Sequence, residues 1–227
     1  MTPKECVNKT DLLNSLPDEW PEDLLPKIQQ LVKASRRKVV VLDDDPTGTQ
    51  TVHGIHVLTE WPVERLRDEL ANDLPAFYLL TNSRSLTASG AEAMNREIAA
   101  NLLEAARQAG REFAVVSRSD STLRGHFPRE VEALAQGLGH GRREAWLIIP
   151  FFLEGGRYTI DDIHYVAEGD WLVPAGQTEF ARDAAFGYQS SNLREWVEEK
   201  TEGRVPVESV ASLSIEDIRR GGPARVA

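Results

Sequence analysis

Apolar positions along the chain follow two alternating periods. Short β-branched or aromatic runs, which are typical of buried parallel strands, alternate with stretches in which apolar residues recur every three or four positions, which are typical of helices. The clearest helical stretch lies at about 89–109 and stops before Gly110, a residue suited to a C-terminal cap. The expected strands are 38–43, 54–59, 76–81, 113–117 and 145–149.

Alternation of strands and helices predicts a mostly parallel sheet with helices on both faces, a Rossmann-like three-layer α/β sandwich. We expect residues 1–37 to form an amphipathic helical lead-in and residues 38–227 to form one α/β domain. Another helix is expected after Pro128. Residues 151–189 show little periodicity, and we interpret them as long excursions over the carboxyl edge of the sheet.

The C-terminal part regains a regular pattern. It predicts a helix that begins at Ser190 or Ser191 and stops near Gly203, a strand at 207–211, and a helix that a capping box at Ser214 opens and Gly221-Gly222-Pro223 ends. The chain stops where another strand should begin, so we expect the α/β domain to be incomplete at its C-terminus.

Charge and cysteine content narrow the class of partner and compartment. The net charge is −10, with 20 Arg and only 6 Lys, which disfavours nucleic acid or an anionic membrane surface as a partner. Cys6 is the single cysteine, so no intramolecular disulfide and no Cys-based zinc site are expected. The sequence shows neither a signal peptide nor an apolar run of membrane-spanning length, and we expect a cytoplasmic protein.

Polar clusters follow three of the expected strands directly. They are Asp43–Thr49, Thr81–Ser85 and Ser117–Gly125. Since parallel strands end at one edge of a sheet, where open α/β sheets hold their ligands, the three clusters should converge. Asp side chains suit sugar-like hydroxyls, and Arg binds carboxylate or phosphate bidentately, so the combination favours a small polyhydroxy acid as ligand. A solvated acidic turn and ordinary surface ion pairs are the alternatives.

A fourth cluster, Glu154–Tyr165, is expected to be a lid or a second wall of the site. His164 in this cluster is either a general acid or base or a structural histidine buried among aromatics, and the sequence leaves both open. We assign no metal-ligating residue.

A phosphatase of the haloacid dehalogenase type is a competing interpretation. Asp43 and Asp45 after an apolar strand look like the first motif of that family, with Asp43 as nucleophile and Asp45 as general acid. The family also needs a lysine before its acidic Mg²⁺ pair, and no lysine occurs between Thr81 and Asp161-Asp162.

The strand-end motifs together resemble the N-terminal, substrate-binding domain of the four-carbon acid sugar kinase family. The matching segments are Asp44–Gly48, Thr81–Ser85, Ser117–Gly125, Pro150–Thr159 and Thr178–Asp183. The string Asp-Ser-Thr-Leu-Arg-Gly at 120–125 is specific, and the resemblance runs from about residue 17 to the end. It is closest to the subgroup with Asp-Asp-Asp-Pro-Thr-Gly-Thr-Gln at 43–50.

This resemblance implies ATP-dependent phosphorylation of acids such as threonate or erythronate, with Mg²⁺ and ATP held by a C-terminal domain of similar size. Asp45 would be the catalytic residue that orients or activates the attacked hydroxyl. The substrate-binding residues would be Asp44, Thr47, Gly48, Ser83, Arg84, Asp120, Ser121, Thr122, Arg124, Gly125, Arg157 and Thr159.

The sequence departs from the family because it shows no ATP site. Gly155-Gly156 and Gly221-Gly222 are single doublets, too little for a phosphate-binding loop. We therefore expect the substrate-binding portion of a kinase, inactive without a nucleotide-binding domain. The expected partners are a small sugar acid and either a separate nucleotide-binding chain or further copies of this chain in a homo-oligomer. The alternative is a non-catalytic ligand-binding module or the product of a decayed gene.

Overall fold

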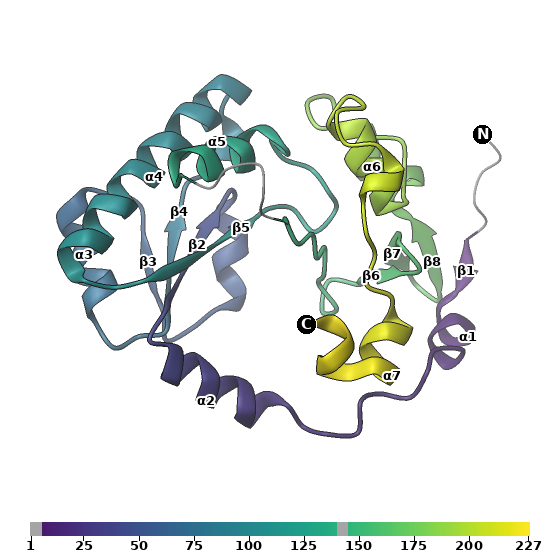
Figure 1. Ribbon diagram of the computed structural model, residues 1–227. Helices are drawn as coiled ribbons and strands as arrows, with labels where there is room; N and C mark the ends of the chain where they lie inside the picture. The colour runs from purple at the N-terminus through teal and green to yellow at the C-terminus, as the bar shows by residue number, and fades with distance from the viewer. Residues whose placement is uncertain (1–5, 140–144) are drawn as a thin grey trace. The chain divides into compact units, whose positions relative to one another are not determined.

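The structure, a computed structural model, describes residues 6–139 and 145–227, without the side chains of Gln50 and Thr51. Residues 1–5 of the expected lead-in lie outside this part. The chain divides into two compact units that are described separately (Figure 1). Unit 1 comprises residues 1–23, 121–124 and 147–227, and unit 2 comprises residues 24–120 and 125–146. The domain boundaries expected from the sequence stay a prediction.

Unit 2 is built on a parallel sheet in the order β3-β4-β2-β5. Its strands are β2 (Lys38–Asp43), β3 (His56–Leu58), β4 (Ala76–Leu80) and β5 (Phe113–Arg118). Its helices are α2 (Leu25–Ser35), α3 (Val63–Ala71), α4 (Ala88–Ala109) and α5 (Arg129–Gly137). The predicted fold class, an α/β fold with a mostly parallel sheet flanked by helices as in a three-layer sandwich, is confirmed.

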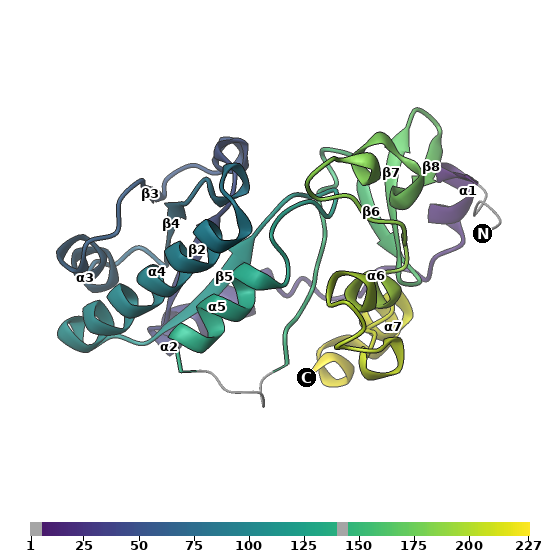
Figure 2. The ribbon, with the colours of Figure 1, turned by 90° about the horizontal axis from the view of Figure 1, so that it is seen from above.

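The core of unit 2 lies between the sheet and the row of helices α3, α4 and α5 (Figures 1 and 2). Alternation along β2 and β4 turns one set of side chains to these helices. The buried set comprises Val40, Leu42, Leu66, Leu70, Phe77, Leu79, Ile98, Leu102 and Leu134. This burial fixes the sheet and therefore the position of the strand ends. The long helix α4 matches the predicted one, and Gly110 caps it with φ of 60°.

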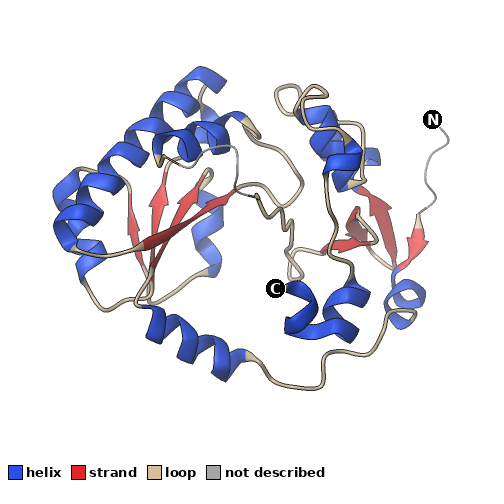
Figure 3. Cartoon of the chain, viewed as in Figure 1, coloured by secondary structure: helices blue, strands red, loops and turns tan. Residues whose placement is uncertain are grey.

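Unit 1 contains a second sheet, antiparallel and in the order β1-β8-β7-β6 (Figure 3). Its strands are β1 (Val7–Asn8), β6 (Arg157–Ile160), β7 (Ile163–Glu168) and β8 (Trp171–Pro174). Its helices are α1 (Lys9–Asn14), α6 (Leu193–Lys200) and α7 (Ile215–Val226). The prediction that 151–189 forms only long excursions is therefore wrong. Two-residue turns join β6 to β7 and β7 to β8, and at Asp161-Asp162 both residues have positive φ.

Two segments that were predicted to be strands, 145–149 and 207–211, do not form strands. Residues 145–149 are extended chain without a strand partner, and Leu147 and Ile149 are 73% and 69% exposed. Residues 207–211 contain a short 3₁₀ helix, Val207–Ser209, in place of a strand. Strand propensity alone does not supply a neighbouring strand, and pairing depends on tertiary context.

The ends of the C-terminal helices are close to their predicted positions. Helix α6 is capped by Asn192, whose side chain accepts from the backbone of Arg194 and Glu195, and not by Ser190 or Ser191. The capping box at Ser214 is present, with Asp217 as its partner. The backbone leaves the helical conformation at Gly222, where a Cβ would overlap the ring of Trp20.

Candidate functional site

Three strand ends of unit 2 lie side by side. Asp43, the last residue of β2, is in register with Leu80 of β4 and with Arg118 of β5. Because all three strands are parallel, the polar residues that follow each of them begin at the same edge of the sheet. The strand ends at which the three clusters begin therefore lie side by side as predicted, whereas the convergence of the complete clusters on one crevice and their role in ligand binding stay predictions.

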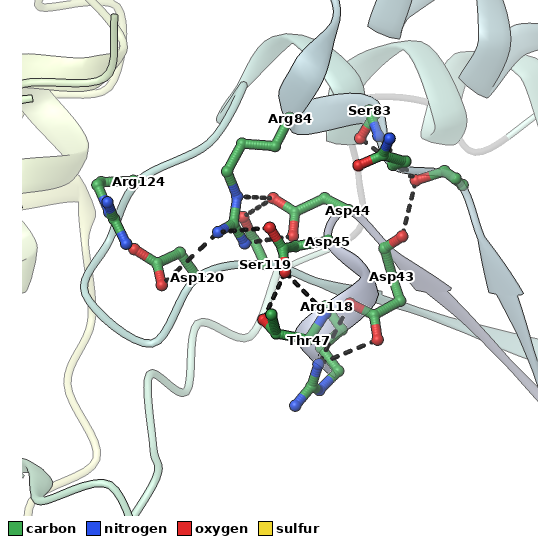
Figure 4. Close-up of polar contacts among 12 residues, drawn as sticks. Asp43, Asp44, Asp45, Thr47, Ser83, Arg84, Arg118, Ser119, Asp120 and Arg124 are labelled. Carbon is green, nitrogen blue, oxygen red and sulfur yellow. Dashed lines mark hydrogen bonds and ion pairs between the residues drawn. The ribbon is translucent and has the colours of Figure 1, made fainter. Parts of the chain in front are cut away.

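Asp44 is the centre of this edge (Figure 4). Arg84 binds its carboxylate through two nitrogens, with Nη2–Oδ1 at 2.6 Å and Nε–Oδ2 at 3.1 Å. The Ser119 hydroxyl donates to Oδ2 at 2.6 Å. Asp44 is 3% exposed, so its ion pair with Arg84 is buried and bidentate. Through Arg84 and Ser119, Asp44 is hydrogen-bonded to residues of both other clusters.

Arg84 also approaches two further carboxylates. Its Nη1 lies 3.4 Å from Oδ2 of Asp45 and 3.9 Å from Oδ1 of Asp120 (Figure 4). Burial lowers the pKa of the Arg84 guanidinium, but the hydrogen bond to Asp44 and the charges of all three carboxylates outweigh it, and the pKa is raised overall. Arg84 therefore keeps its charge at neutral pH.

Asp43 is more deeply buried than Asp44 and pairs with Arg118. The Arg118 Nη1 is 3.2 Å and 3.0 Å from the two carboxylate oxygens of Asp43, which is 1% exposed. Burial raises the pKa of Asp43, against the opposing effect of Arg118. A Cβ on Gly48 would overlap both side chains, so only glycine leaves room for this ion pair. Gly48, which was predicted to bind ligand, therefore has a structural role: it leaves space for the Asp43–Arg118 ion pair.

Asp45 differs from the two preceding aspartates in its exposure. It caps the 3₁₀ helix Pro46–Thr51 by accepting from the Thr47 backbone at 2.8 Å, and the Thr47 hydroxyl also donates to it. Its side chain is 26% exposed, compared with 4% for Asp44 and 1% for Asp43. Of the three aspartates, Asp45 is the one whose carboxylate solvent reaches best.

Glu130 is a buried carboxyl group that the sequence analysis missed. It lies in the first turn of α5, is 4% exposed, and accepts from the Ser83 hydroxyl at 2.9 Å. Burial raises its pKa to about 7, and the negative charge of Asp44 adds to this effect. A signal was present in the sequence, since Glu130 occupies the same helical stripe as the buried Ala133 and Leu134. Arg118 and Ser119 were quoted in the motif but not assigned to the site.

The remaining predicted residues lie in unit 1, apart from Gly125, which stays in unit 2 with φ of 136°. Residues 121–124 are fixed by two side chains that bind their backbone. His164 Nε2 lies 2.8 Å from the Ser121 carbonyl oxygen, and the Tyr188 hydroxyl donates to the Thr122 carbonyl at 2.7 Å.

His164 has a structural environment. Its ring is fully buried, and its Nδ1 lies 2.9 Å from the hydroxyl of Thr159. Both ring nitrogens are thus engaged with the protein, which favours the structural alternative for this residue. Thr159 additionally donates to the Pro150 carbonyl at 3.0 Å, so its hydroxyl also supports the fold.

Two predicted ligand-binding arginines share one aromatic ring in unit 1. The guanidinium carbons of Arg124 and Arg157 lie 5.2 Å and 5.3 Å from the centroid of Phe180. Arg124 also lies 3.6 Å from Asp183, and its Nε donates to the Thr122 hydroxyl at 3.2 Å. The Nε of Arg157 is buried and has no hydrogen-bond partner within the described protein. This cluster, Arg124–Phe180–Arg157, is hereafter the stacked pair.

Each of the two units thus contains some of the residues that were predicted to form the ligand site. Unit 2 presents the carboxylates of Asp43, Asp44, Asp45 and Asp120 against the guanidiniums of Arg84 and Arg118. Carboxylates are acceptors for sugar hydroxyls, and a guanidinium is the donor for a carboxylate or phosphate. Among residues 6–139 and 145–227, no group of three or more His, Cys, Asp or Glu is arranged to hold a metal ion. In the same residues, no helix is long and apolar enough to span a bilayer.

The model of one protein family matches residues 39–227, which is most of the chain. The chain belongs to the family of sugar-binding N-terminal domains. This finding fits the resemblance to the substrate-binding domain of the four-carbon acid sugar kinases. No curated protein matches the chain.

The solved structures that match this chain include the following two. One is a domain of unknown function (DUF1537) from Bordetella bronchiseptica, a domain-swapped dimer with bound citrate, with 24% identity and a TM-score of 0.53 over 70% of this chain and 39% of that one. The other is a Salmonella typhimurium LT2 protein named as a candidate tRNA synthase, with 16% identity and a TM-score of 0.47 over 71% and 38% of the two chains. The chain spans about two fifths of the length of the solved proteins it matches.

Proposed function

We propose that this chain is the sugar-acid-binding part of an ATP-dependent kinase for four-carbon sugar acids of the threonate or erythronate type. The observation that carries the proposal is the Asp44–Arg84 pair, buried at the carboxyl edge of a parallel sheet in a chain of the sugar-binding family. Charged groups concentrated there lower local stability, and such clusters are typical of ligand sites.

The chemistry of the edge suits a polyhydroxy acid. Asp45 and Asp120 offer carboxylate oxygens to hydroxyl groups, and the guanidinium of Arg84, whose side chain is 18% exposed, offers donors to an acid group. The citrate bound by the Bordetella protein is a small hydroxy acid of the same chemical class, which supports this choice of ligand. The stacked pair, in unit 1, is a separate candidate for binding an acid group.

Asp45 is our choice for the catalytic carboxylate. Its greater exposure, relative to Asp43 and Asp44, leaves it accessible to a hydroxyl that attacks phosphorus. The phosphatase interpretation finds less support, because the nucleophile it requires, Asp43, is 1% exposed and bound by Arg118.

The nucleotide site is not assigned to this chain. Gly155-Gly156 forms the turn before β6, and Gly222 breaks α7, so neither doublet is a phosphate-binding loop. ATP and Mg²⁺ would be held by a nucleotide-binding domain of the family, and the described residues supply sugar-acid binding, orientation and the carboxylate of Asp45. A homo-oligomer is a further part of the proposal, supported by the domain-swapped dimer of the Bordetella protein, and the molar mass measured by light scattering tests it.

A thermal-shift titration tests ligand binding. Threonate, erythronate and their lactones are each added to the purified chain, with and without ATP and Mg²⁺. A ligand at about 100 times its Kd stabilises the native state by about 2.7 kcal/mol, a shift of several degrees. We expect a shift with a sugar acid and none with ATP alone. Cooperative melting that no sugar acid shifts would contradict the proposal.

The role of Asp45 is tested separately with Asp45→Asn in an enzyme reconstituted with a nucleotide-binding domain of the family. Loss of the base or acceptor should lower kcat by about 10²-fold or more while sugar-acid binding persists. Unchanged turnover would exclude Asp45 as the catalytic residue. The matched control is Asp68→Asn, a carboxylate in an exposed ion pair with Arg67.

A further inference from the structure

Glu130 connects the interior of unit 2 to the loop that carries Arg84. Its carboxylate accepts from Ser83, the residue before Arg84, and Ser83 is 1% exposed. The Thr81 hydroxyl lies 3.3 Å from that of Ser83 and donates to the Asp43 carbonyl at 2.9 Å. Glu130 therefore anchors a short, buried hydrogen-bonded chain that holds the end of β4 next to the end of β2.

The charged groups around Glu130 have opposite effects on the ionisation of its carboxyl group. Asp44, at the end of β2, disfavours the ionised carboxylate, whereas Arg84 favours it. On the side of α4, Glu92 is engaged with Arg129, 3.6 Å away. His126 contacts Glu130 through its carbonyl oxygen, which accepts from the Glu130 amide at 3.2 Å. The carboxylate thus has a hydroxyl donor in Ser83, a like charge in Asp44 and an opposite charge in Arg84.

An anion bound to Arg84 changes this balance. In the free protein, the positive charge of Arg84 stabilises ionised Glu130 and opposes the repulsion from Asp44. A ligand carboxylate bound to Arg84 would offset part of this stabilisation. The ionised form of Glu130 would then become less stable in the complex than in the free protein. A buried acid in this situation takes up a proton instead of holding an uncompensated charge.

We propose that Glu130 is a positioning residue of the Arg84 site, which holds Ser83 in place and takes up a proton when an anionic ligand binds to Arg84. This inference rests on the proposed function, since it needs a ligand with an acid group. By linkage, the same coupling makes the protein with neutral Glu130 bind a sugar acid more tightly than the protein with ionised Glu130. Affinity falls as pH rises through neutrality.

The supporting electrostatics are those described above. Burial is the largest cause that raises the pKa of Glu130, followed by the charge of Asp44, and the result is a pKa of about 7 in the free protein. At neutral pH, Glu130 is therefore ionised in some molecules and protonated in others, and a small change in the electrostatic field changes the proportion of the two forms. We expect the affinity for threonate to be about fivefold or more higher with Glu130 neutral than with it ionised, the usual lower range of a coupling between two sites.

Isothermal titration calorimetry of the full chain with threonate tests the inference. Titrations at neutral pH in PIPES and in imidazole, two buffers with different ionisation enthalpies, report the protons taken up per ligand bound. We expect net uptake by the wild type. We expect little or none by Glu130→Gln, which keeps an oxygen to accept from Ser83 and binds with a pH-independent Kd close to that of the wild type at low pH. Glu132→Gln, on the same helix α5, is the matched control and should retain the uptake.

Ser83→Ala supplies a second variant. Its missing hydroxyl no longer stabilises the ionised carboxylate, so the pH of maximal uptake should move upward, which a purely structural role would not cause. Threonate binding by the wild type without proton uptake, or uptake that persists in Glu130→Gln, would overturn the inference and leave the proposed function intact. Absence of binding at any pH by a cooperatively folded wild type would overturn the proposed function and this inference with it.

Discussion

The carboxyl edge of unit 2 and the stacked pair of unit 1 use arginine in two different ways. At the edge, Arg84 and Arg118 are bound by buried carboxylates. In the stacked pair, Arg124 and Arg157 lie on the face of Phe180, and the carboxylate of Asp183 lies 3.6 Å from Arg124. Stacking uses the face of a guanidinium, whereas a bidentate carboxylate binds its N–H edge.

This difference indicates a division of roles. Arginines that are neutralised by buried aspartates hold strand ends in register and shape the site, and removing either partner leaves a buried charge. Arginines on an aromatic ring contribute less to stability and more to attracting an anion. Variants of the buried ion pairs at the edge should therefore change folding as well as ligand binding, and variants of the stacked pair should mainly change ligand affinity.

The largest effect is expected for Asp44→Ala. It leaves the Arg84 guanidinium and the Ser119 hydroxyl without their buried acceptor. We expect a loss of about 3–5 kcal/mol in the free energy of unfolding, measured by urea denaturation. Asp68→Ala, which removes an exposed ion pair with Arg67, should cost about 0.5 kcal/mol or less. Equal effects of the two variants would remove the distinction between the edge and ordinary surface pairs.

Glu130→Gln should change the pH dependence of stability. The folded-state pKa of Glu130, about 7, lies above its ordinary value of 4.5, so the folded state holds the proton more tightly than the unfolded state. Stability from this group is therefore fully present at low pH and is lost as pH rises to about 7, by on the order of 3 kcal/mol. At about pH 8 the Gln variant should be more stable than wild type by a similar amount, and the two should agree near pH 4.5. Parallel stability curves of the two proteins over this range would show that Glu130 is not protonated preferentially in the folded state.

Tyr188→Phe tests how unit 1 holds residues 121–124. It removes the hydroxyl that donates to the Thr122 carbonyl at 2.7 Å, and Tyr188 is 5% exposed. An unsatisfied buried acceptor should lower the free energy of unfolding by about 1–2 kcal/mol, measured by urea denaturation. Tyr158→Phe, at a half-buried ring, serves as the control. A loss no greater than that of the control would mean that this hydrogen bond does not fix the segment.

The smallest stability effect is expected for Phe180→Leu. Loss of the ring under Arg124 and Arg157 should cost about 1 kcal/mol, while the affinity for threonate falls by several-fold because the guanidiniums are no longer held. Phe151→Leu, at a side chain 63% exposed, is the control. An affinity equal to that of wild type would assign the acid group of the ligand to Arg84 and not to the stacked pair.

Much of unit 2 could be predicted from the sequence because its signals are local. The β-branched run of β2 and the helical periodicity of α4 identify their elements without knowledge of the rest of the fold. The convergence of the strand ends follows from parallel topology alone. What local signals did not show was the pairing inside the site, such as that of Arg118 with Asp43, because these residues are 75 positions apart in the chain.

The antiparallel sheet of unit 1 was missed for two reasons. Its strands are only four to six residues long apart from β1, which has two, and their turns carry unusual residues. Asp161 and Asp162 adopt positive φ in a turn for which Asn-Gly is the usual signal. Gly169-Asp170 between β7 and β8 was a readable hairpin signal. The strand predicted at 145–149 shows the opposite failure, in which propensity was present and a partner strand was not.

The route of the chain through the two units has a consequence for protein engineering. The backbone passes from one unit to the other after residues 23, 120, 124 and 146. A cut or a truncation at any one of these points therefore removes neither unit whole, and each unit is assembled from separate stretches of sequence. Expressing either unit alone would require joining those stretches with new linkers, and a fusion or an inserted tag is safer in a surface loop within one stretch than at a crossing. The string at 120–125 contains two of the four crossings, so a library that varies it alters the connections between the two units together with the candidate ligand contacts.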